Sequence, residues 1–156
     1  MTAKPEVKKL VEEALAASRL KNYDLAISKF REALLLENNL QKPRLILGQI
    51  LKDLGRTEEA RLEFLYITKL RPSSEIASLA YYHSALSCGH VFEAIQEAKR
   101  FLAIKKSEEL ESLLKGLEWL LNEANGDERA VVTAFKNRKE EREKENKGTS
   151  LMNSKE

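Results

Sequence analysis

Hydrophobic residues recur along the chain at helical spacing, returning every three or four positions with polar residues between them. This pattern predicts helices over about 6–20, 23–37, 57–70 and 91–105, and further apolar helical stripes over 45–54, 76–86, 110–121 and 130–135. Residues that favour turns or stop helices separate the segments, among them Gly55, Pro72, Gly89 and Gly126. Since every apolar segment follows helical spacing, the chain is predicted to be all-α.

The helical pattern repeats at a fixed distance. Ala26, Ala60 and Ala94 are separated by 34 residues each time, and Gly89 follows Gly55 at the same interval. A period of this length is typical of stacked helix pairs, in which one unit cannot bury its apolar face alone. The sequence therefore predicts an α-solenoid of antiparallel helix pairs. Its second helices are predicted to bury residues at equivalent positions of the unit. Phe30 and Phe64 occupy one such position, Phe101 a second and Leu36 a third.

The period changes near the C-terminus. Gly126 follows Gly89 by 37 residues, so the helix between them is predicted to be about one turn longer than the others and to cap the open end of the stack. From Lys136 the sequence becomes almost entirely charged. The predicted division begins with a lead-in at 1–6 and three repeats at 7–40, 41–74 and 75–108. A capping or degenerate fourth helix pair follows at 109–146, and a disordered tail at 147–156.

These repeats resemble the tetratricopeptide-repeat (TPR) family, whose 34-residue unit favours small and aromatic residues at set positions. The matching residues are Leu10, Ala14, Ala26, Phe30 and Ala33 in the first unit, Leu47, Gly48, Ala60, Phe64 and Pro72 in the second, and Ala94 in the third. Each unit alone matches weakly, but three units follow one another in unbroken register. Trp119 departs from the family pattern, because a small residue is favoured there, and this favours a cap over a fourth repeat.

The resemblance also implies where a partner binds. In this family the first helix of each pair lines a concave face, and positions 2, 5, 9 and 12 of the unit point into it. Residues three and four apart do lie on one face of a helix. The predicted peptide-binding groove contains Lys8, Val11, Leu15, Lys42, Leu45, Gln49, Lys52, Leu79, His83 and Leu86.

The predicted groove differs from the clamp with which some TPR proteins hold the acidic tails of heat-shock chaperones. That clamp uses Lys, Asn and Arg side chains, whereas Val11, Leu15, Leu79 and His83 stand at four of its places. An apolar groove suits an amphipathic helix or an extended peptide with hydrophobic anchors. The alternative is that several of these residues are packed between helices or are covered by the final helix.

Composition excludes several classes of function. Residues 1–135 carry 20 basic and 20 acidic side chains, and residues 136–156 carry seven against five, so the folded part has no excess of positive charge for binding nucleic acid. No apolar run is long enough to span a membrane. The N-terminus lacks the apolar stretch of a secretory signal, and Cys88 is the single cysteine, so the cytoplasm is the expected location.

Motifs for catalysis and for binding metals or phosphates are lacking. The two histidines, His83 and His90, have no partner at metal-ligand spacing, and neither a phosphate-binding glycine loop nor a nucleophile elbow occurs. We therefore expect a protein that is not an enzyme and that has no metal and no cofactor.

The predicted function is that of an adaptor or scaffold that binds a protein or peptide partner with hydrophobic anchors. Two alternatives remain open at this point. The size and repeat number resemble those of the small TPR chaperones of type III secretion, which keep an aggregation-prone client soluble. The chain could also assemble with itself, as a homodimer formed through the groove or the C-terminal helix. The identity of the partner does not follow from the sequence.

Overall fold

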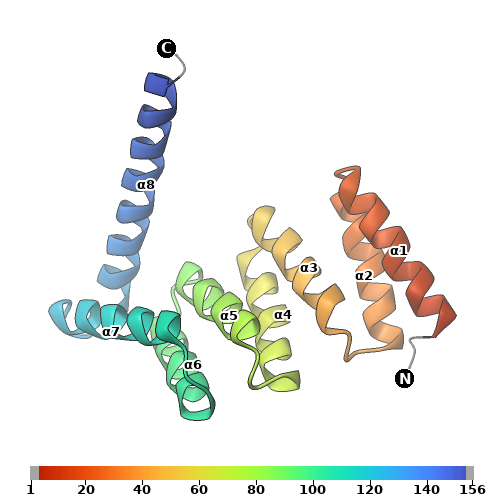
Figure 1. The fold of residues 1–156 in the computed structure, drawn as a ribbon, viewed down its shortest axis with the longest axis horizontal. Helices are drawn as coiled ribbons and strands as arrows, with labels where there is room; N and C mark the ends of the chain where they lie inside the picture. Colours follow the sequence, from red (N-terminus) through yellow and green to blue (C-terminus); the bar gives the residue numbers. More distant parts are fainter. Residues whose placement is uncertain (1–3, 154–156) are drawn as a thin grey trace.

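Helices make up nearly all of residues 4–153, the part of the chain that a computed structural model describes (Figure 1). These residues form α1 (Pro5–Arg19), α2 (Tyr23–Leu36), α3 (Gln41–Asp53), α4 (Thr57–Leu70), α5 (Glu75–Ser87), α6 (Val91–Ile104), α7 (Glu108–Glu123) and α8 (Glu128–Asn153). No strand occurs among the described residues. The all-α prediction is confirmed.

Each helix from α1 to α7 packs against the next one along the chain, so the array grows by adding neighbours in sequence order (Figure 1). Short turns connect the helices; α1 and α2, α3 and α4, and α5 and α6 pack closely in pairs, whereas α8 leaves α7 at a steep angle (Figure 1). The base of α8 contacts α6 and α7, and the rest of this helix projects away from the array (Figure 1).

The turns inside the helix pairs repeat with the period of the sequence. In each turn a backbone N–H donates to the carbonyl five residues earlier, which satisfies an otherwise unpaired carbonyl at the helix end. The donors and acceptors are Asn22 and Ala17, Arg56 and Leu51, and His90 and Ala85, at 2.8–2.9 Å. Gly55 and Gly89 adopt positive φ angles of 75° and 86° in these turns, and Lys21 adopts 58° at the equivalent place.

The core follows the predicted repeat. Ala26, Ala60 and Ala94 are completely buried, and Phe30, Phe64 and Phe101 are buried beside them. The small side chains of the three alanines let the second helix of each pair approach its neighbours closely. The prediction that Leu36 is buried is wrong, because Leu36 is the last residue of α2 and its side chain is 45% exposed.

The C-terminal helices differ from the repeats. The α7 helix has 16 residues, so it is nearly one turn longer than α3 and α5, which have 13 each, but only one residue longer than α1, which has 15. It buries Leu110 and Leu117, whereas Trp119 is 57% exposed. Trp119 therefore lies outside any tight helix contact, which explains how a large side chain is accommodated where the repeat pattern favours a small one.

The long α8 helix is anchored at its base only. Val131 is buried, but every residue from Lys136 to Gly148 is exposed. Predicted disorder from residue 147 differs from the structure, in which α8 continues as a helix to Asn153. Opposite charges four residues apart along this segment favour the helix even without packing. Residues 154–156 lie outside the described part of the chain.

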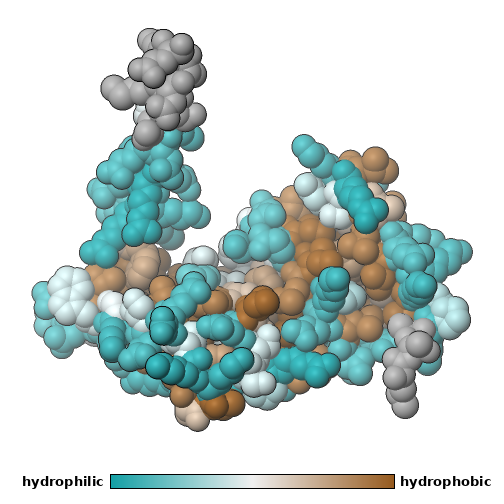
Figure 2. Space-filling model, in the orientation of Figure 1, coloured by the Kyte–Doolittle hydropathy of each residue, from teal (hydrophilic) through white to brown (hydrophobic). Residues whose placement is uncertain are grey.

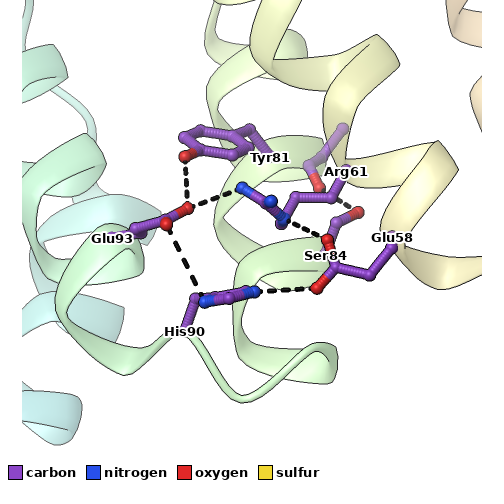
Figure 3. Close-up of polar contacts among 7 residues, drawn as sticks. Glu58, Arg61, Tyr81, Ser84, His90 and Glu93 are labelled. Atoms are coloured by element: carbon purple, nitrogen blue, oxygen red, sulfur yellow. Dashed lines mark hydrogen bonds and ion pairs between the residues drawn. The ribbon is translucent and has the colours of Figure 1, made fainter.

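A polar network joins α4, α5 and α6 (Figure 3). The Arg61 guanidinium contacts Glu58 at 2.9 Å and Glu93 at 2.8 Å. The Tyr81 hydroxyl donates to Glu93 at 2.8 Å, and the His90 Nε2 atom lies 2.7 Å from Glu58. Through Tyr81 the network links α5, the helix that supplies His83 and Leu86, to Glu93 of α6.

Acid is expected to weaken this network. Hydrogen bonds from His90 and then Arg61 lower the pKa of Glu58 below its usual 4.5. A carboxylate with a lowered folded-state pKa stabilises the fold above its unfolded-state pKa, and this contribution is lost as the pH falls through the lower value. We therefore expect Glu58→Gln to flatten the pH dependence of the unfolding free energy below about pH 5, with a loss of under ~1 kcal/mol at neutral pH.

Urea unfolding at a series of acidic pH values measures this effect. Glu12→Gln provides the control, because Glu12 is an exposed carboxylate of α1 for which the described residues show no ion pair. In the control, the unfolding free energy should depend on pH as it does in the wild type. The same wild-type pH dependence in Glu58→Gln would contradict the assigned role of the network.

Candidate functional site

The ten residues of the predicted groove lie on the first helix of each pair, α1, α3 and α5. None of them is fully buried. Five are aliphatic and partly buried, packed against the edge of the core, and five are polar and exposed. The aliphatic residues are Val11, Leu15, Leu45, Leu79 and Leu86, and the polar residues are Lys8, Lys42, Gln49, Lys52 and His83. We call this set the groove face.

The groove face exists because these helices carry more apolar residues than the core buries. Buried residues such as Ala14, Leu47 and Ala85 form the stripe that faces the core. Val11, Leu45 and similar residues flank that stripe, so their side chains contact the core on one side and solvent on the other. Figure 2 shows hydrophobic side chains gathered around α1 and α3.

Three groove-face residues, Lys52, His83 and Leu86, lie together in a cavity of about 450 Å³ at the base of α8. Residues of α7 and α8 form its other walls. We call this cavity the elbow pocket, lined by Lys52, Tyr82, His83, Leu86, Ser87, Leu113, Val132, Phe135, Lys136 and Lys139. The other seven groove-face residues lie outside it.

The sequence left open that the final helix covers part of the groove, but the contribution of α7 to this pocket was missed. The repeat register assigns a groove position only within residues 7–108, and it does not predict how a helix beyond the repeats approaches them. A signal was present, because Val132 and Phe135 belong to the apolar stripe of 130–135 that ends where the charged segment begins. In the structure both side chains are partly buried against the core.

The charged side chains that line the elbow pocket are all basic. Three lysines line it, and no aspartate or glutamate does. The pKa of His83 is lowered from its usual 6.5, mainly because burial disfavours the charged imidazolium; nearby Lys52 lowers it further and Glu109 opposes the shift. The histidine is therefore neutral at neutral pH, and the lysines supply the positive charge.

Tyr82 forms the inner end of the pocket. Its ring is fully buried and meets the His83 imidazole edge-on, with 5.3 Å between the ring centroids. Its hydroxyl donates to the backbone carbonyl of Leu113 at 3.2 Å, which links α5 to α7. Burial raises the pKa of Tyr82 to about 12, so the hydroxyl keeps its proton and remains a donor at neutral pH. Tyr82 thus has a packing role.

Metal sites and membrane-spanning helices are absent from residues 4–153. No group of three or more His, Cys, Asp and Glu side chains within this range is arranged to hold a metal ion. Within the same range no helix is both long and apolar enough to cross a membrane.

Comparisons with solved structures identify the fold. The first TPR domain of Spaghetti (RPAP3), bound to an HSP90 peptide, matches with a TM-score of 0.59 and 15% identity over 78% of this chain and 99% of that domain. The TPR domain of Sgt2 from Aspergillus fumigatus matches with a TM-score of 0.61 and 19% identity, over 81% of this chain and 85% of that one. The chain has the tetratricopeptide-repeat fold. The predicted resemblance to TPR proteins is confirmed at the level of fold.

A third TPR array is more similar in sequence. MamA (AMB-1) is 27% identical, with a TM-score of 0.57 over 68% of this chain, and the chain spans 59% of the length of MamA. No family model and no curated protein matches the sequence.

Proposed function

We propose that this TPR array is a non-catalytic scaffold that holds a peptide or helix of a partner protein on its groove face. The observation that carries the proposal is the composition of that face, which presents five partly exposed aliphatic side chains on three helices with polar residues among them. An amphipathic helix or an extended peptide with spaced hydrophobic anchors fits such a surface.

A related structure supports peptide binding as the type of activity, because the RPAP3 domain of the same fold holds an HSP90 peptide. The groove face is expected to recognise its peptide in a different way from a carboxylate clamp. Val11, Leu15 and Leu79 offer hydrocarbon where a carboxylate clamp needs donors. We therefore expect the partner to be selected by its apolar anchors and not by a terminal carboxylate.

The exposed apolar surface of the groove face is sufficient to bind a peptide with moderate affinity. Each of the five aliphatic side chains is at most about one-third exposed, and burying that remaining surface contributes up to about 1 kcal/mol at the usual 25 cal/mol per Å². Five such contacts on the chain, matched by the anchors of the peptide, offset part of the cost of ordering the peptide. A dissociation constant in the micromolar range, or about −8 kcal/mol, is the result we expect.

A peptide-display selection against the full chain tests the proposal. Leu45→Glu and Leu79→Glu place charges in the centre of the groove face, and both should weaken the selected peptides at least about tenfold, equivalent to ~1.4 kcal/mol. Leu62→Glu is the matched control, because Leu62 is 55% exposed on α4, outside the groove face. Circular dichroism would verify that all three variants are folded.

The result could also contradict the proposal. If the selected peptides bind Leu45→Glu and Leu79→Glu as well as they bind the wild type, the groove face is not the binding surface. Loss of binding in Leu62→Glu instead would assign the partner to the outer side of the array.

A further inference from the structure

The elbow pocket has features of a specific subsite. We propose that it binds an acidic peptide segment of a partner through one bulky apolar side chain, which enters between Leu86, Leu113 and Phe135, and through carboxylates that reach the lysines of the rim. This inference rests on the proposed scaffold function and names the chemistry of the partner at one end of the groove face.

The interior of the pocket is apolar. Leu86 of α5, Leu113 of α7, and Val132 and Phe135 of α8 are all partly buried and pack against the core while lining the cavity. A volume of about 450 Å³ accommodates a leucine or phenylalanine side chain together with flanking backbone. Because the walls come from three helices, an apolar side chain in this position contacts hydrocarbon on several sides.

The rim of the pocket is positively charged from two directions. Lys52 comes from the end of α3, and Lys136 and Lys139 come from the base of α8. Within the described part of the chain none of these three lysines forms an ion pair, whereas lysines elsewhere do: Lys29 pairs with Glu13, and Lys99 pairs with Glu118. Unpaired cations around an apolar cavity complement a ligand that is both acidic and apolar.

Charge also argues against a second copy of the chain as the occupant. The natural candidate is the projecting part of α8, which would have to enter the pocket of another copy. Residues 136–147 carry six basic and four acidic side chains. This excess of positive charge would meet the lysines of the pocket, so an acidic partner segment fits better.

An occupied pocket would connect the array to α8. Without a ligand, the base of α8 is held mainly by its few contacts with α6 and α7. A ligand between Leu86 and Phe135 adds a contact between α5 and α8. We expect amide hydrogen exchange at the base of α8 to slow down when the pocket is filled.

The test uses the full chain and a short fluorescein-labelled peptide with one Phe flanked on both sides by Asp and Glu residues. Two variants of the peptide separate the contributions, one with Ala in place of Phe and one with Asn and Gln in place of the acids. The protein variants are the double charge reversal Lys136→Glu with Lys139→Glu, and the control Lys144→Glu with Lys147→Glu. The control residues are exposed on α8 beyond the pocket.

Fluorescence anisotropy should show that the acidic Phe peptide binds and that both altered peptides bind at least about tenfold more weakly. Reversal at Lys136 and Lys139 should weaken binding to a similar extent, and the control reversal should leave it unchanged. Equal binding by the two charge-reversal variants, or by the Phe and Ala peptides, would overturn the proposal.

Two other results would also overturn it. Displacement of a weakly bound peptide by oleate at much lower concentration would assign the pocket to a free anionic amphiphile. A doubled mass in light scattering, reversed by the Lys136→Glu and Lys139→Glu changes, would assign it to a second copy. The Leu45→Glu variant keeps the two proposals distinct, because it should lose the display-selected peptides and still bind the acidic Phe peptide.

Discussion

Phe101→Ala is expected to lower the free energy of unfolding by about 3–5 kcal/mol, the usual cost of removing a fully buried phenylalanine ring. Phe101 is completely buried on α6, within the continuous hydrophobic core. This helix packs against α5, α7 and α8, so the cavity left by the ring lies where the repeats meet the C-terminal helices. A solenoid depends on such contacts between neighbours, since each unit touches few others.

Urea denaturation followed by circular dichroism measures this loss, with Phe92→Ala as the control. Phe92 is on the same helix, but its side chain is 52% exposed. Its removal should cost under about 1 kcal/mol. Similar losses for the two variants would contradict the assignment of Phe101 to the core.

The second large effect is expected at Gly48, where a helix approaches an aromatic ring. A Cβ atom at Gly48 would lie 2.5 Å from Cε1 and 2.8 Å from Cζ of Phe64. Phe64 is itself buried on α4, so its ring has little freedom to move away. We expect Gly48→Ala to destabilise the fold, because overpacking of about 1–3 kcal/mol exceeds a gain of about 1 kcal/mol in helix propensity.

Gly116→Ala is the matched control for this prediction. Gly116 is also within a helix, but apart from its chain neighbours and the adjacent backbone of its own helix no heavy atom lies within 4 Å of the added Cβ. The substitution should therefore stabilise the chain by up to about 1 kcal/mol. Thermal unfolding of the two variants should shift the midpoint in opposite directions, and shifts of the same sign would contradict the packing described here.

The period of the sequence predicted much of this fold because the period has a physical cause. Ala26, Ala60 and Ala94 recur where helices pack closely, and Gly55 and Gly89 recur where the backbone needs a positive φ. Each of these constraints acts within one unit or between adjacent units. Local spacing therefore contains enough information to place the helices and their buried faces.

The elbow pocket could not be predicted in the same way. It depends on the direction in which α8 leaves α7, and the repeat contains no information about that angle. Phe135 and Lys136 are adjacent in sequence, and they could be recognised as the end of an apolar stripe and the start of a charged one. Their position beside His83 depends on contacts of α8 with α6 and α7, which only the structure shows.

The most direct test of the scaffold function is a map of the bound surface. Amide chemical shifts of the isotope-labelled full chain would be recorded with and without the tightest peptide from the display selection. We expect the changes to concentrate on α1, α3 and α5, around residues such as Val11, Leu45 and Leu79. Changes confined to α2, α4 and α6 would contradict this expectation and would show that the array binds its partner on the opposite side.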